Sequence, residues 1–580
     1  MAGPLARRDK LRHHATMTAS DPVNLDLLEL APMVSRVLEI GCGQGLFAAA
    51  YRLRNPSCHY VGIETNGFAA QLAAAHIDRV LINDFRVIDV SALTADGPYD
   101  LILFGNMRQY LREMDVVLAK AHGLLAPDGH LLLCLLNGAH WSRLADGTGG
   151  PSASGAPGLS RSAFVGIEHL AGALEKNAFR RIKQRPVKRP PDAAQAETLL
   201  PLLGKIGEWL GKSRDALVER SAIAHHVVIA KRADAPFIPS VHVRVAALVP
   251  RFMDVRARLP ASYMLSVPEL VISYQERSVG LTNAPDGPRI FLVQRPAAPD
   301  RESWQQAVGA AIATGWLVVT EYDDHPELVG KVLKWPPERA RWLHIAGAHA
   351  VQTSTEPLAV AFREHNPEVR AFANAAFTLP PLPVRSAGPR RVFYGALNRG
   401  AFSGALAASL APAIAAHPDT LFHVVHDRPF FDALPTDRKQ FSPALDYQRY
   451  LEAIDGCDIA LLPLAGEDFE LFKSDLKYVE CASRGAAVIA SPAVYRDSVV
   501  DGRTGLIAPA LEDWAPALDR LLGDDGLRDG LARNAWDDVR DHRMFAAQVR
   551  ARAGWYRHLL QRYDELHQGL KARCPWLVQG

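Results

Sequence analysis

The sequence predicts an α/β protein in which three largely parallel sheets follow one another along the chain. Short apolar segments of strand length alternate with helical segments, which is the pattern of parallel sheets with crossover helices. A linker at residues 233–239 and a proline-rich stretch at residues 379–383 divide this pattern. The 580 residues are enough for several domains, and the 48% of apolar residues can fill several cores.

The first predicted strand leads into a glycine-rich loop. Residues 37–40 are apolar except for Glu39, and a helix is predicted over residues 46–53. Three alternating glycines lie between them: Gly41, Gly43 and Gly45. Glycine permits positive φ angles and close backbone approach, so the loop can surround a ligand at the carboxyl end of the strand, with the helix N-terminus directed at it. The pattern indicates a nucleotide-type cofactor.

Acidic residues end the next two predicted strands. Glu64 ends the strand predicted over residues 59–64, about 20 residues after the glycines, where a carboxylate can bind two ribose hydroxyls. Asp84 ends the strand predicted over residues 80–84 and is a further candidate for cofactor binding. Three more strands are predicted to complete this sheet, over residues 99–104, 130–136 and 225–230.

Two cofactors fit the glycine loop. Gly43, Gly45 and Ala48 match the loose dinucleotide pattern G-x-G-x-x-A. Glu39, however, lies just before the glycines, where its charge would repel a pyrophosphate and attract a ligand that carries an ammonium and a sulfonium group. S-adenosylmethionine is therefore favoured over a dinucleotide.

In these motifs and in the order of its strands, the segment of residues 1–235 resembles the Rossmann-like S-adenosylmethionine-dependent methyltransferases. Methyl transfer to a hydroxyl needs a base, and His140, in the loop after the fifth strand, is the candidate catalytic base. Related sugar-modifying methyltransferases carry a similar Asn and His here, which match Asn137 and His140. The sequence departs from them at residues 105–110, which lack their acidic and histidine residues. An exposed loop histidine without a catalytic role is the other interpretation of His140.

Connections and one long helix are predicted for the rest of this first part. Residues 147–158, rich in Gly, Ser, Ala and Pro, are predicted to form a loop, and the basic, proline-containing residues 180–191 a connector. A helix is expected over residues 194–220. The basic run at residues 180–189 is compatible with contact with anionic lipid or a phosphate-linked acceptor, but a solvated charged face is the simpler interpretation.

Residues 241–385 and 386–540 are each predicted to form one further parallel sheet. The expected strands are residues 289–294, 316–321 and 350–354 in the first of these sheets, and residues 391–395, 421–425, 459–463 and 487–491 in the second. Two Rossmann-like lobes that face each other across a cleft describe the GT-B architecture. Residues 541–580 carry an apolar stripe at helical spacing and are expected to pack back on a lobe.

Residues 473–480, 485–491 and 501–506 together resemble the donor-binding lobe of the group 1 glycosyltransferases. A sugar nucleotide presents a diphosphate, which cations and helix N-termini can bind, and a ribose diol, which a carboxylate can bind. The resemblance implies that Glu480 binds the ribose and that basic residues bind the diphosphate. The candidate donor-binding residues are Gly395, Asn398, Arg399, Lys473, Ser474, Lys477 and Glu480.

One position departs from the motif of that family. The family pairs two glutamates eight positions apart, and the position eight before Glu480 is Phe472. Glu470 and Glu467 are the candidates to replace the missing carboxylate. The resemblance otherwise implies retention of configuration and no obligatory metal.

Acidic residues also follow a predicted strand of the middle sheet. Asp323 and Asp324 lie after residues 316–321, so they are expected at a carboxyl edge that faces the cleft, together with His325. They are candidate catalytic residues, as a base or as a clamp for the acceptor hydroxyl. A solvated acidic turn before Pro326 is the alternative.

Composition argues against several other classes of protein. With 65 basic and 63 acidic residues the net charge is +2, which gives no general affinity for nucleic acid. The six cysteines lack metal-ligand spacing, which fits a reducing compartment and predicts no metal site. No segment has the ~20 apolar residues of a membrane span or the pattern of a signal peptide. We therefore expect a cytoplasmic protein, with peripheral contact at the inner face of the membrane as an extension of that expectation.

The sequence thus predicts a bifunctional transferase of polysaccharide biosynthesis. The glycosyltransferase part would transfer a sugar from a nucleotide-sugar to a saccharide or lipid-linked acceptor, and the methyltransferase part would methylate a sugar. Tethering the two is advantageous when both act on one glycan. The alternatives are an active glycosyltransferase with a methyltransferase-like domain that only binds or scaffolds, and a protein without catalysis in either half.

Overall fold

The computed structural model describes residues 23–142, 166–248, 253–277, 286–296, 298–332, 334, 342–385, 388–396 and 399–578. The chain divides into two compact units, the first ending at Ala233 and the second beginning at Asp234, with two short segments at residues 32–35 and 52–59 grouped with the second. The loop predicted over residues 147–158 lies outside the described residues.

The first unit contains a seven-stranded sheet of order β3-β2-β1-β4-β5-β7-β6. Its strands are β1 (Arg36–Ile40), β2 (His59–Glu64), β3 (Arg79–Ile82), β4 (Tyr99–Phe104), β5 (Leu125–Leu136), β6 (Phe179–Lys188) and β7 (Ile223–Arg232). The first five are parallel, whereas β7 is antiparallel to β5 and β6 is antiparallel to β7. The strand order reverses between β1 and β4, and ligands bind at such a switch point in open α/β sheets.

Helices accompany this sheet, and its main core lies against α5 and α7. Phe104, Leu118 and Leu170 are fully buried in that core. The helices are α1 (Leu25–Leu30), α2 (Leu46–Arg54), α3 (Gly67–Ala73), α4 (Ser91–Thr94), α5 (Met114–Leu124), α7 (Gly166–Lys176), α8 (Ala193–Leu210), α9 (Arg214–Ser221) and the 3-10 helix η2 (Met107–Tyr110).

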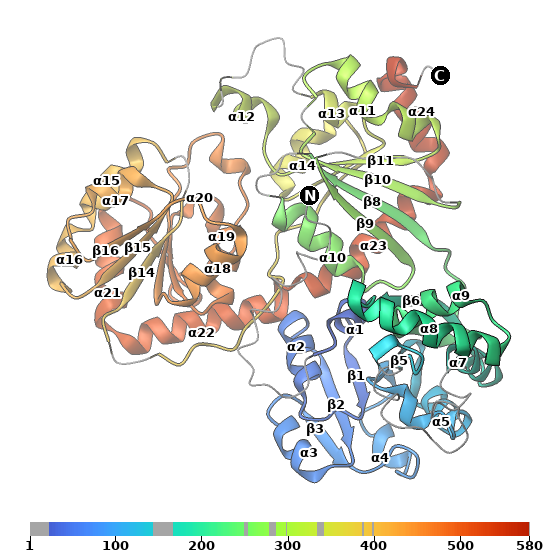
Figure 1. Cartoon of the computed structure of the whole chain (residues 1–580). Helices are drawn as coiled ribbons and strands as arrows, with labels where there is room; N and C mark the ends of the chain where they lie inside the picture. The colour runs from blue at the N-terminus through green and yellow to red at the C-terminus, as the bar shows by residue number, and fades with distance from the viewer. Residues whose placement is uncertain are drawn as a thin grey trace. The chain divides into compact units, whose positions relative to one another are not determined.

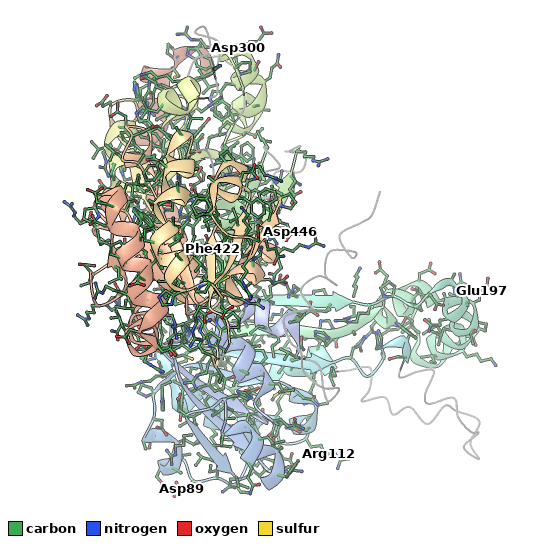
Figure 2. The ribbon with its side chains drawn as sticks, turned by 90° about the vertical axis from the view of Figure 1, so that its left-hand side faces the viewer. Asp89, Arg112, Glu197, Asp300, Phe422 and Asp446 are labelled. Atoms are coloured by element: carbon green, nitrogen blue, oxygen red, sulfur yellow. The ribbon has the colours of Figure 1, made fainter. Side chains whose placement is uncertain are left out.

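Two connections of the first unit differ from the sequence prediction. The basic segment predicted as a connector is strand β6, which lies at the edge of the sheet, where Pro186 is tolerated because one side of the strand is unpaired. The single helix predicted over residues 194–220 is two helices, α8 and α9, because Gly211 adopts a φ of 65° between them. Glu197 lies on the exposed side of α8 (Figure 2).

The second unit begins with a six-stranded sheet of order β13-β12-β11-β10-β8-β9, with all pairs parallel. Its order reverses between β8 and β10. Its strands are β8 (Val241–Ala247), β9 (Leu270–Glu276), β10 (Arg289–Gln294), β11 (Leu317–Tyr322), β12 (Ala350–Thr353) and β13 (Val369–Ala371). Its helices are the π-helix η4 (Asp254–Arg258), α10 (Leu259–Met264), α11 (Arg301–Ala313), α12 (Pro326–Val332), α13 (Leu343–Ala346) and α14 (Glu356–Arg363).

The third sheet is also six-stranded and parallel, of order β16-β15-β14-β17-β18-β19, and reverses between β14 and β17. Figure 1 shows it between α16 on one side and α18 and α19 on the other, and Phe422 is buried in its core (Figure 2). Its strands are β14 (Arg391–Tyr394), β15 (Leu421–Val425), β16 (Lys439–Ser442), β17 (Ile459–Leu462), β18 (Ala487–Ala490) and β19 (Leu506–Ile507).

The helices that accompany the third sheet include two short 3-10 turns. They are α15 (Ala401–Ser409), α16 (Ala411–Ala416), α17 (Arg428–Ala433), α18 (Tyr447–Asp455), η5 (Glu470–Phe472), α19 (Leu476–Ser483), α20 (Pro492–Tyr495), η6 (Leu511–Asp513), α21 (Trp514–Gly523) and α22 (Asp525–His542). Helix α19 carries Lys477 and Glu480 of the donor motif. It connects the parallel strands β17 and β18, so it runs against their direction and begins on the side of their carboxyl ends.

The last helices of the chain return to the second sheet. These are α23 (Phe545–Gln561), α24 (Tyr563–Arg573) and the 3-10 turn η7 (Pro575–Leu577). Phe545, Trp555 and Leu559 are buried in the core of the second sheet, and the Tyr556 hydroxyl donates to Gln352 Oε1 at 3.1 Å. A Rossmann-like sheet followed by two parallel lobes with a returning C-terminal helix confirms the predicted fold class. None of the helices in the described part of the chain is long and apolar enough to cross a bilayer.

Candidate active sites

The glycine loop lies at the carboxyl end of β1, at the switch point of the first sheet. Gly41, Gly43 and Gly45 have φ angles of 74°, 54° and 77°, which side chains other than glycine rarely adopt. A Cβ on Gly45 would lie 2.9 Å from the Cα of Ala73. The loop therefore needs glycine both for its backbone conformation and, at Gly45, for packing against α3.

Two carboxylates near this loop are hydrogen bonded to the protein itself. Glu64 accepts from the backbone N–H of Gly43 at 2.8 Å and from that of Asn66 at 2.9 Å, so it orders the loop. Asp84 accepts from Arg86 Nε at 3.0 Å with both oxygens, and this hydrogen bond lowers the pKa of Asp84. Both carboxylates remain at the positions expected for cofactor binding, after β2 and β3.

Glu39 differs from the sequence expectation. Its side chain is buried, and the Tyr60 hydroxyl donates to Oε2 at 2.8 Å. Burial raises the pKa of Glu39 to about 8. The carboxyl is therefore mostly protonated at pH 7 and does not present the fixed negative charge that the sequence argument assumed. A cationic ligand beside it would restore that charge, because a nearby positive charge lowers the pKa of a carboxyl group.

His140 is held by hydrogen bonds on both ring nitrogens. Nε2 lies 3.1 Å from the carbonyl oxygen of Arg189, and Nδ1 lies 2.8 Å from Ser142 Oγ. The side-chain amide of Asn137 donates to the carbonyl oxygens of Arg220 and Ile223. Both residues thus support the loop in this structure, and His140 would have to release a partner before it accepted a proton. Its role as a base stays a prediction.

Two residues of the segment after β4 belong to the core. Met107 and Tyr110 of η2 are buried, and the Tyr110 ring packs edge-to-face on Phe104 at 5.6 Å between centroids. These two residues of the segment that departs from related methyltransferases therefore serve packing, whereas Asn106 and Gln109 are exposed.

Acidic residues of α1 neutralise part of the basic run. Arg185 Nη1 lies 2.8 Å from Glu29 Oε2, and Arg189 Nη2 lies 3.2 Å from the buried Asp26. This pairing favours the interpretation of residues 180–189 as a charged face without a ligand over that of a surface that binds anionic lipid.

The two acids predicted on the acceptor side share one arginine. Asp323 accepts from Arg295 Nε at 2.7 Å, and Asp324 accepts from Arg295 Nη2 at 3.0 Å. Burial would raise the pKa of Asp323, but the charge of Arg295 outweighs it and the pKa lies below its ordinary value. A carboxylate with a lowered pKa is a weak proton acceptor, which favours the clamp over the base for Asp323.

Arg295 was not among the residues that the sequence analysis singled out. It directly follows β10, at the carboxyl edge of the second sheet, and its φ of 46° is unusual for a residue with a side chain. Such strained residues concentrate at functional sites. The signal in the sequence is a cation placed immediately after an apolar strand.

The cation of the donor motif closest to the second sheet is Lys473. Its Nζ donates to Asp324 Oδ1 at 2.5 Å and lies 4.4 Å from the centroid of the Phe469 ring. This ion pair joins the carboxyl edge of the second sheet to that of the third. Next to it, Ser474 Oγ accepts from the Asn374 side-chain amide at 2.7 Å.

Lys477 and Gly395 are brought together at the carboxyl end of β14. The Lys477 ammonium donates to the Gly395 carbonyl oxygen and, at 3.1 Å, to the Tyr450 hydroxyl, and burial lowers the pKa of Lys477. A Cβ on Gly395 would lie 2.6 Å from Cζ of Phe393. Gly395 is thus required by packing of the protein on itself. Asn398, predicted in the same loop, lies outside the described residues.

Arg399 forms a buried ion pair with Glu470. Arg399 Nη1 lies 3.2 Å from Glu470 Oε1, and its Nε donates to the carbonyl oxygen of Pro463 across the switch point at 3.0 Å. Glu470 also accepts from the backbone N–H of Gly466 at 2.9 Å. Glu470 therefore organises the loop after β17, and the suggestion that it replaces the missing glutamate of the motif is not supported. Glu467, the other candidate, is exposed.

Phe472 occupies the position of that missing glutamate. It contacts residues of the lobe that contains the second sheet. Its ring centroid lies 4.6 Å from that of His325, and its carbonyl oxygen accepts from Thr355 Oγ1 at 3.3 Å. Thr355 also caps α14. The substitution of an acid by an aromatic ring thus provides an apolar contact between the two lobes.

Glu480 is buried behind two tyrosines. The hydroxyls of Tyr447 and Tyr450 and the cations of Lys477 and Arg484 lie near its carboxyl group. Burial outweighs these groups and raises the pKa of Glu480 to about 7. A ribose could contact Glu480 only if the tyrosine hydroxyls moved away from one of its carboxylate oxygens.

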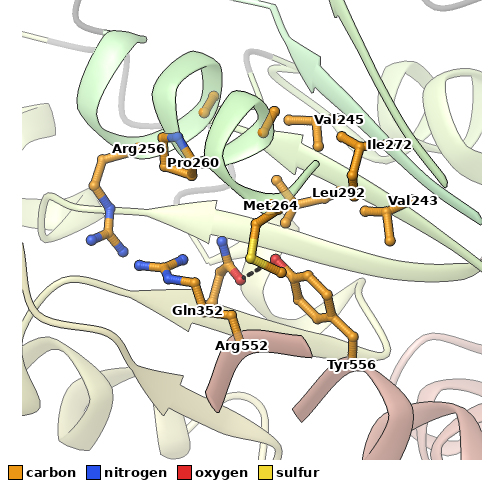
Figure 3. Close-up of a pocket in the computed structure, with 12 residues that line it drawn as sticks. Val243, Val245, Arg256, Pro260, Met264, Ile272, Leu292, Gln352, Arg552 and Tyr556 are labelled. Atoms are coloured by element: carbon orange, nitrogen blue, oxygen red, sulfur yellow. Dashed lines mark hydrogen bonds between the residues drawn. The ribbon is translucent and has the colours of Figure 1, made fainter. Parts of the chain in front are cut away.

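The second unit also contains a small cavity. It is enclosed by η4, α10, α23 and the face of the second sheet, and Figure 3 shows the guanidinium groups of Arg256 and Arg552 at one end of it. Arg256 Nε donates to the fully buried Glu321 at 2.8 Å. Apolar side chains and the hydrogen-bonded pair of Gln352 and Tyr556 line the rest, so this cavity belongs to the packing of the lobe.

Comparisons with known proteins show that the region of the first sheet is similar to methyltransferases. Residues 38–131 match a family model described as a methyltransferase domain. The trans-aconitate 2-methyltransferase of Methylobacterium radiotolerans is 30% identical over 94 residues, which are 16% of this chain and 35% of that protein. The ubiquinone biosynthesis O-methyltransferase of Xanthomonas axonopodis is 26% identical over 163 residues, or 27% of this chain and 60% of that one. The chain therefore spans between about a third and three fifths of these curated relatives.

Solved structures of glycosyltransferases resemble the second unit at low identity. The structure of Anabaena HepE in complex with UDP and glucose covers 54% of this chain and 98% of its own, with a TM-score of 0.38 and 12% identity. The structure of TarM covers 48% of this chain and 54% of its own, with a TM-score of 0.35 and 11% identity. At these TM-scores, the assignment of the two-lobed fold depends on the strand order described above.

Proposed function

We propose that this protein is a bifunctional enzyme of glycan modification, in which residues 241–540 transfer a sugar from a nucleotide donor and residues 1–235 methylate a sugar with S-adenosylmethionine. The observation that carries the first activity is the ion pair between Lys473 and Asp324. It brings together the carboxyl edges of two parallel sheets, and ligands of such sheets bind outside those edges. A donor and an acceptor bound between them would meet there.

The donor's diphosphate fits the cations of the third sheet. Lys473 precedes α19, Lys477 lies in its first turn, and Arg399 follows β14 beside the switch point. Developing negative charge on a leaving diphosphate is stabilised by such groups. We assign the ribose to Glu480, and the acceptor hydroxyl to Asp323 and Asp324, with a saccharide or lipid-linked saccharide as acceptor.

The methyl donor fits the glycine loop of the first sheet. Positive φ angles at three positions without side chains let the loop backbone approach a ligand closely. We assign Glu64 to the ribose and Asp84 to the same cofactor. Glu39 supports a cationic ligand, since a positive charge would convert its buried carboxyl into the ionised form. The ubiquinone biosynthesis relative is named an O-methyltransferase, and we assign a sugar hydroxyl as the methylated group.

A thermal-shift experiment on the purified chain tests both activities. S-adenosylmethionine, S-adenosylhomocysteine and the nucleoside diphosphates of each base, with their sugars, are added singly. A ligand at ~100 times its dissociation constant stabilises the folded state by about 2.7 kcal/mol. We expect shifts from both ligand classes. Gly45→Val should abolish the shift by S-adenosylmethionine alone, and Lys477→Met the shift by nucleotides alone.

A glycosyltransferase with an inactive methyltransferase-like domain is the second candidate. The observation in its favour is that both ring nitrogens of His140 are hydrogen bonded. It predicts that S-adenosylmethionine binds and that no methylated glycan forms. Formation of a labelled glycan from S-adenosylmethionine labelled in the methyl group would exclude this second candidate.

A further inference from the structure

Lys473 is bound by a carboxylate where the donor's diphosphate is expected. Its Nζ donates to Asp324 Oδ1 at 2.5 Å, and the side chains of Lys473 and Asp324 are only 31% and 22% exposed. The two residues come from different sheets, Asp324 after β11 and Lys473 before α19. A carboxylate and a phosphate oxygen present the same kind of acceptor to an ammonium group.

Asp324 has a second partner that does not depend on Lys473. Its other oxygen, Oδ2, accepts from Arg295 Nη2 at 3.0 Å, and the same guanidinium binds Asp323 through Nε at 2.7 Å. The backbone N–H of Arg295 donates to the carbonyl oxygen of Glu321 at 2.9 Å, which holds the strained residue at the sheet edge. If the bond to Lys473 were broken, Asp324 would still be paired with Arg295. Breaking that bond therefore avoids the cost of an isolated buried carboxylate.

The other two cations at this edge have partners within their own lobe. Lys477 donates to Gly395 and Tyr450, and Arg399 pairs with Glu470. The bond from Lys473 differs from these because its acceptor belongs to the opposite lobe.

We propose that Asp324 occupies the diphosphate position on Lys473 in the free protein, and that a bound nucleoside diphosphate takes its place and leaves Asp324 on Arg295. This inference rests on the proposed glycosyltransferase function. It makes Arg295 a positioning residue, which keeps both acids at the edge during the exchange. It also orders the reaction, because Asp324 Oδ1 becomes available to an acceptor hydroxyl only after the donor has bound.

The exchange is tested by nucleotide affinity in a variant that lacks the competing charge. Calorimetric titration of the full chain with UDP, GDP, ADP, CDP and dTDP first identifies the nucleotide. Asp324→Asn should then bind that nucleotide about two- to fivefold more tightly, the range expected for loss of a partly exposed ion pair that binding must break. The matched control is Glu356→Gln, which removes an acid of the same lobe that pairs with Arg363 and not with Lys473.

A second variant separates competition from a general effect of charge. In a Lys473→Met background, Asp324→Asn should leave nucleotide affinity unchanged, because the bond that it relieves is already absent. Equal affinity of Asp324→Asn and the unmodified chain, or equal gains in Asp324→Asn and Glu356→Gln, would overturn the exchange while the glycosyltransferase proposal stood. If no nucleoside diphosphate bound the unmodified chain, the proposed function itself would fail, and the exchange with it.

Arg295 is tested by the dependence of transfer on donor and acceptor. Arg295→Lys keeps the charge but cannot bind two carboxylates through separate nitrogens of one planar group. We expect it to raise the KM for the acceptor more than tenfold and to change the Kd for the nucleotide less than twofold. An unchanged acceptor KM would contradict the positioning role. Far-ultraviolet circular dichroism of each variant confirms that it is folded.

Discussion

At the glycine loop of the first sheet the carboxylate of Glu64 binds backbone N–H groups, whereas at the edges of the second and third sheets Asp323, Asp324 and Glu470 bind the side chains of arginine and lysine. Backbone groups stay in place when a ligand arrives. Lysine and arginine side chains can change partners, so a site made from them can rearrange. The first site is therefore preorganised by chain conformation, and the second by charges that a ligand must redistribute.

Two buried glutamates, one in each site, also differ in the charges that surround them. Glu39 accepts a hydrogen bond from Tyr60, Glu480 lies beside two tyrosines, and burial raises both pKa values, to about 8 and about 7. The smaller shift at Glu480 reflects Lys477 and Arg484 beside it. A site that lacks a cation of its own, such as that of Glu39, gains more from a cationic ligand than one that already contains two.

The largest expected effect is loss of the buried charge pair of the third sheet. Arg399→Met leaves Glu470 buried without its partner, and removal of one member of such a pair costs about 3–5 kcal/mol. Urea unfolding measures the change. The control is Arg390→Met, whose partner Asp525 is exposed, with an expected loss below ~1 kcal/mol. A small loss in Arg399→Met would contradict a stabilising role for its ion pair with Glu470.

The next effect breaks the glycine loop through its backbone. Gly45→Ala combines an unfavourable positive φ with a Cβ placed 2.9 Å from Ala73, and we expect a loss of about 2–4 kcal/mol. Gly43→Ala is the matched control, since it shares the positive φ but meets no atom within 4 Å, and about 1–2 kcal/mol is expected. Chemical unfolding of the two variants gives the comparison. Equal losses would show that packing against α3 is unimportant.

A smaller, pH-dependent effect concerns Glu39. Its folded-state pKa of about 8 lies above the ordinary value of 4.5, so between these pH values the folded chain binds more protons than the unfolded chain. Stability contributed by Glu39 is therefore full below pH 4.5 and is lost as pH rises through 8. Glu39→Gln should flatten this dependence in unfolding curves recorded across that window, while the exposed Glu175→Gln should not. The same decline in both variants would mean that Glu39 does not control it.

The smallest effect concerns the apolar contact between the lobes. Phe472→Ala removes the ring that packs on His325, and a loss of about 1 kcal/mol is expected for a half-buried aromatic. The neighbouring Leu471, 51% exposed, provides the control, with a change within ~0.5 kcal/mol for Leu471→Ala. The denaturant midpoints of unfolding of both variants measure these two losses of stability. A larger loss at Leu471 would place the lobe contact elsewhere.

Much of the fold follows from local sequence patterns. The strands at residues 59–64, 99–104, 289–294 and 421–425 have the bounds that their apolar runs predict. Strand β6 could not be predicted in the same way, because its basic residues and Pro186 are those of a connector and only pairing with β7 makes it a strand. The break between α8 and α9 at Gly211 was likewise missed, since an isolated glycine is tolerated within many helices.

By itself, the sequence determined the glycine loop of the first sheet, the α/β class and the candidate acids and cations at strand ends, because these depend on residues that are adjacent in the chain. Only the tertiary structure decided how those charges are paired. Arg295 meets Asp323 and Asp324 across two strands, Lys473 meets Asp324 across two sheets, and burial makes Glu39 a weak acid. Coulombic energies and desolvation depend on distances in space, which the order of residues does not specify.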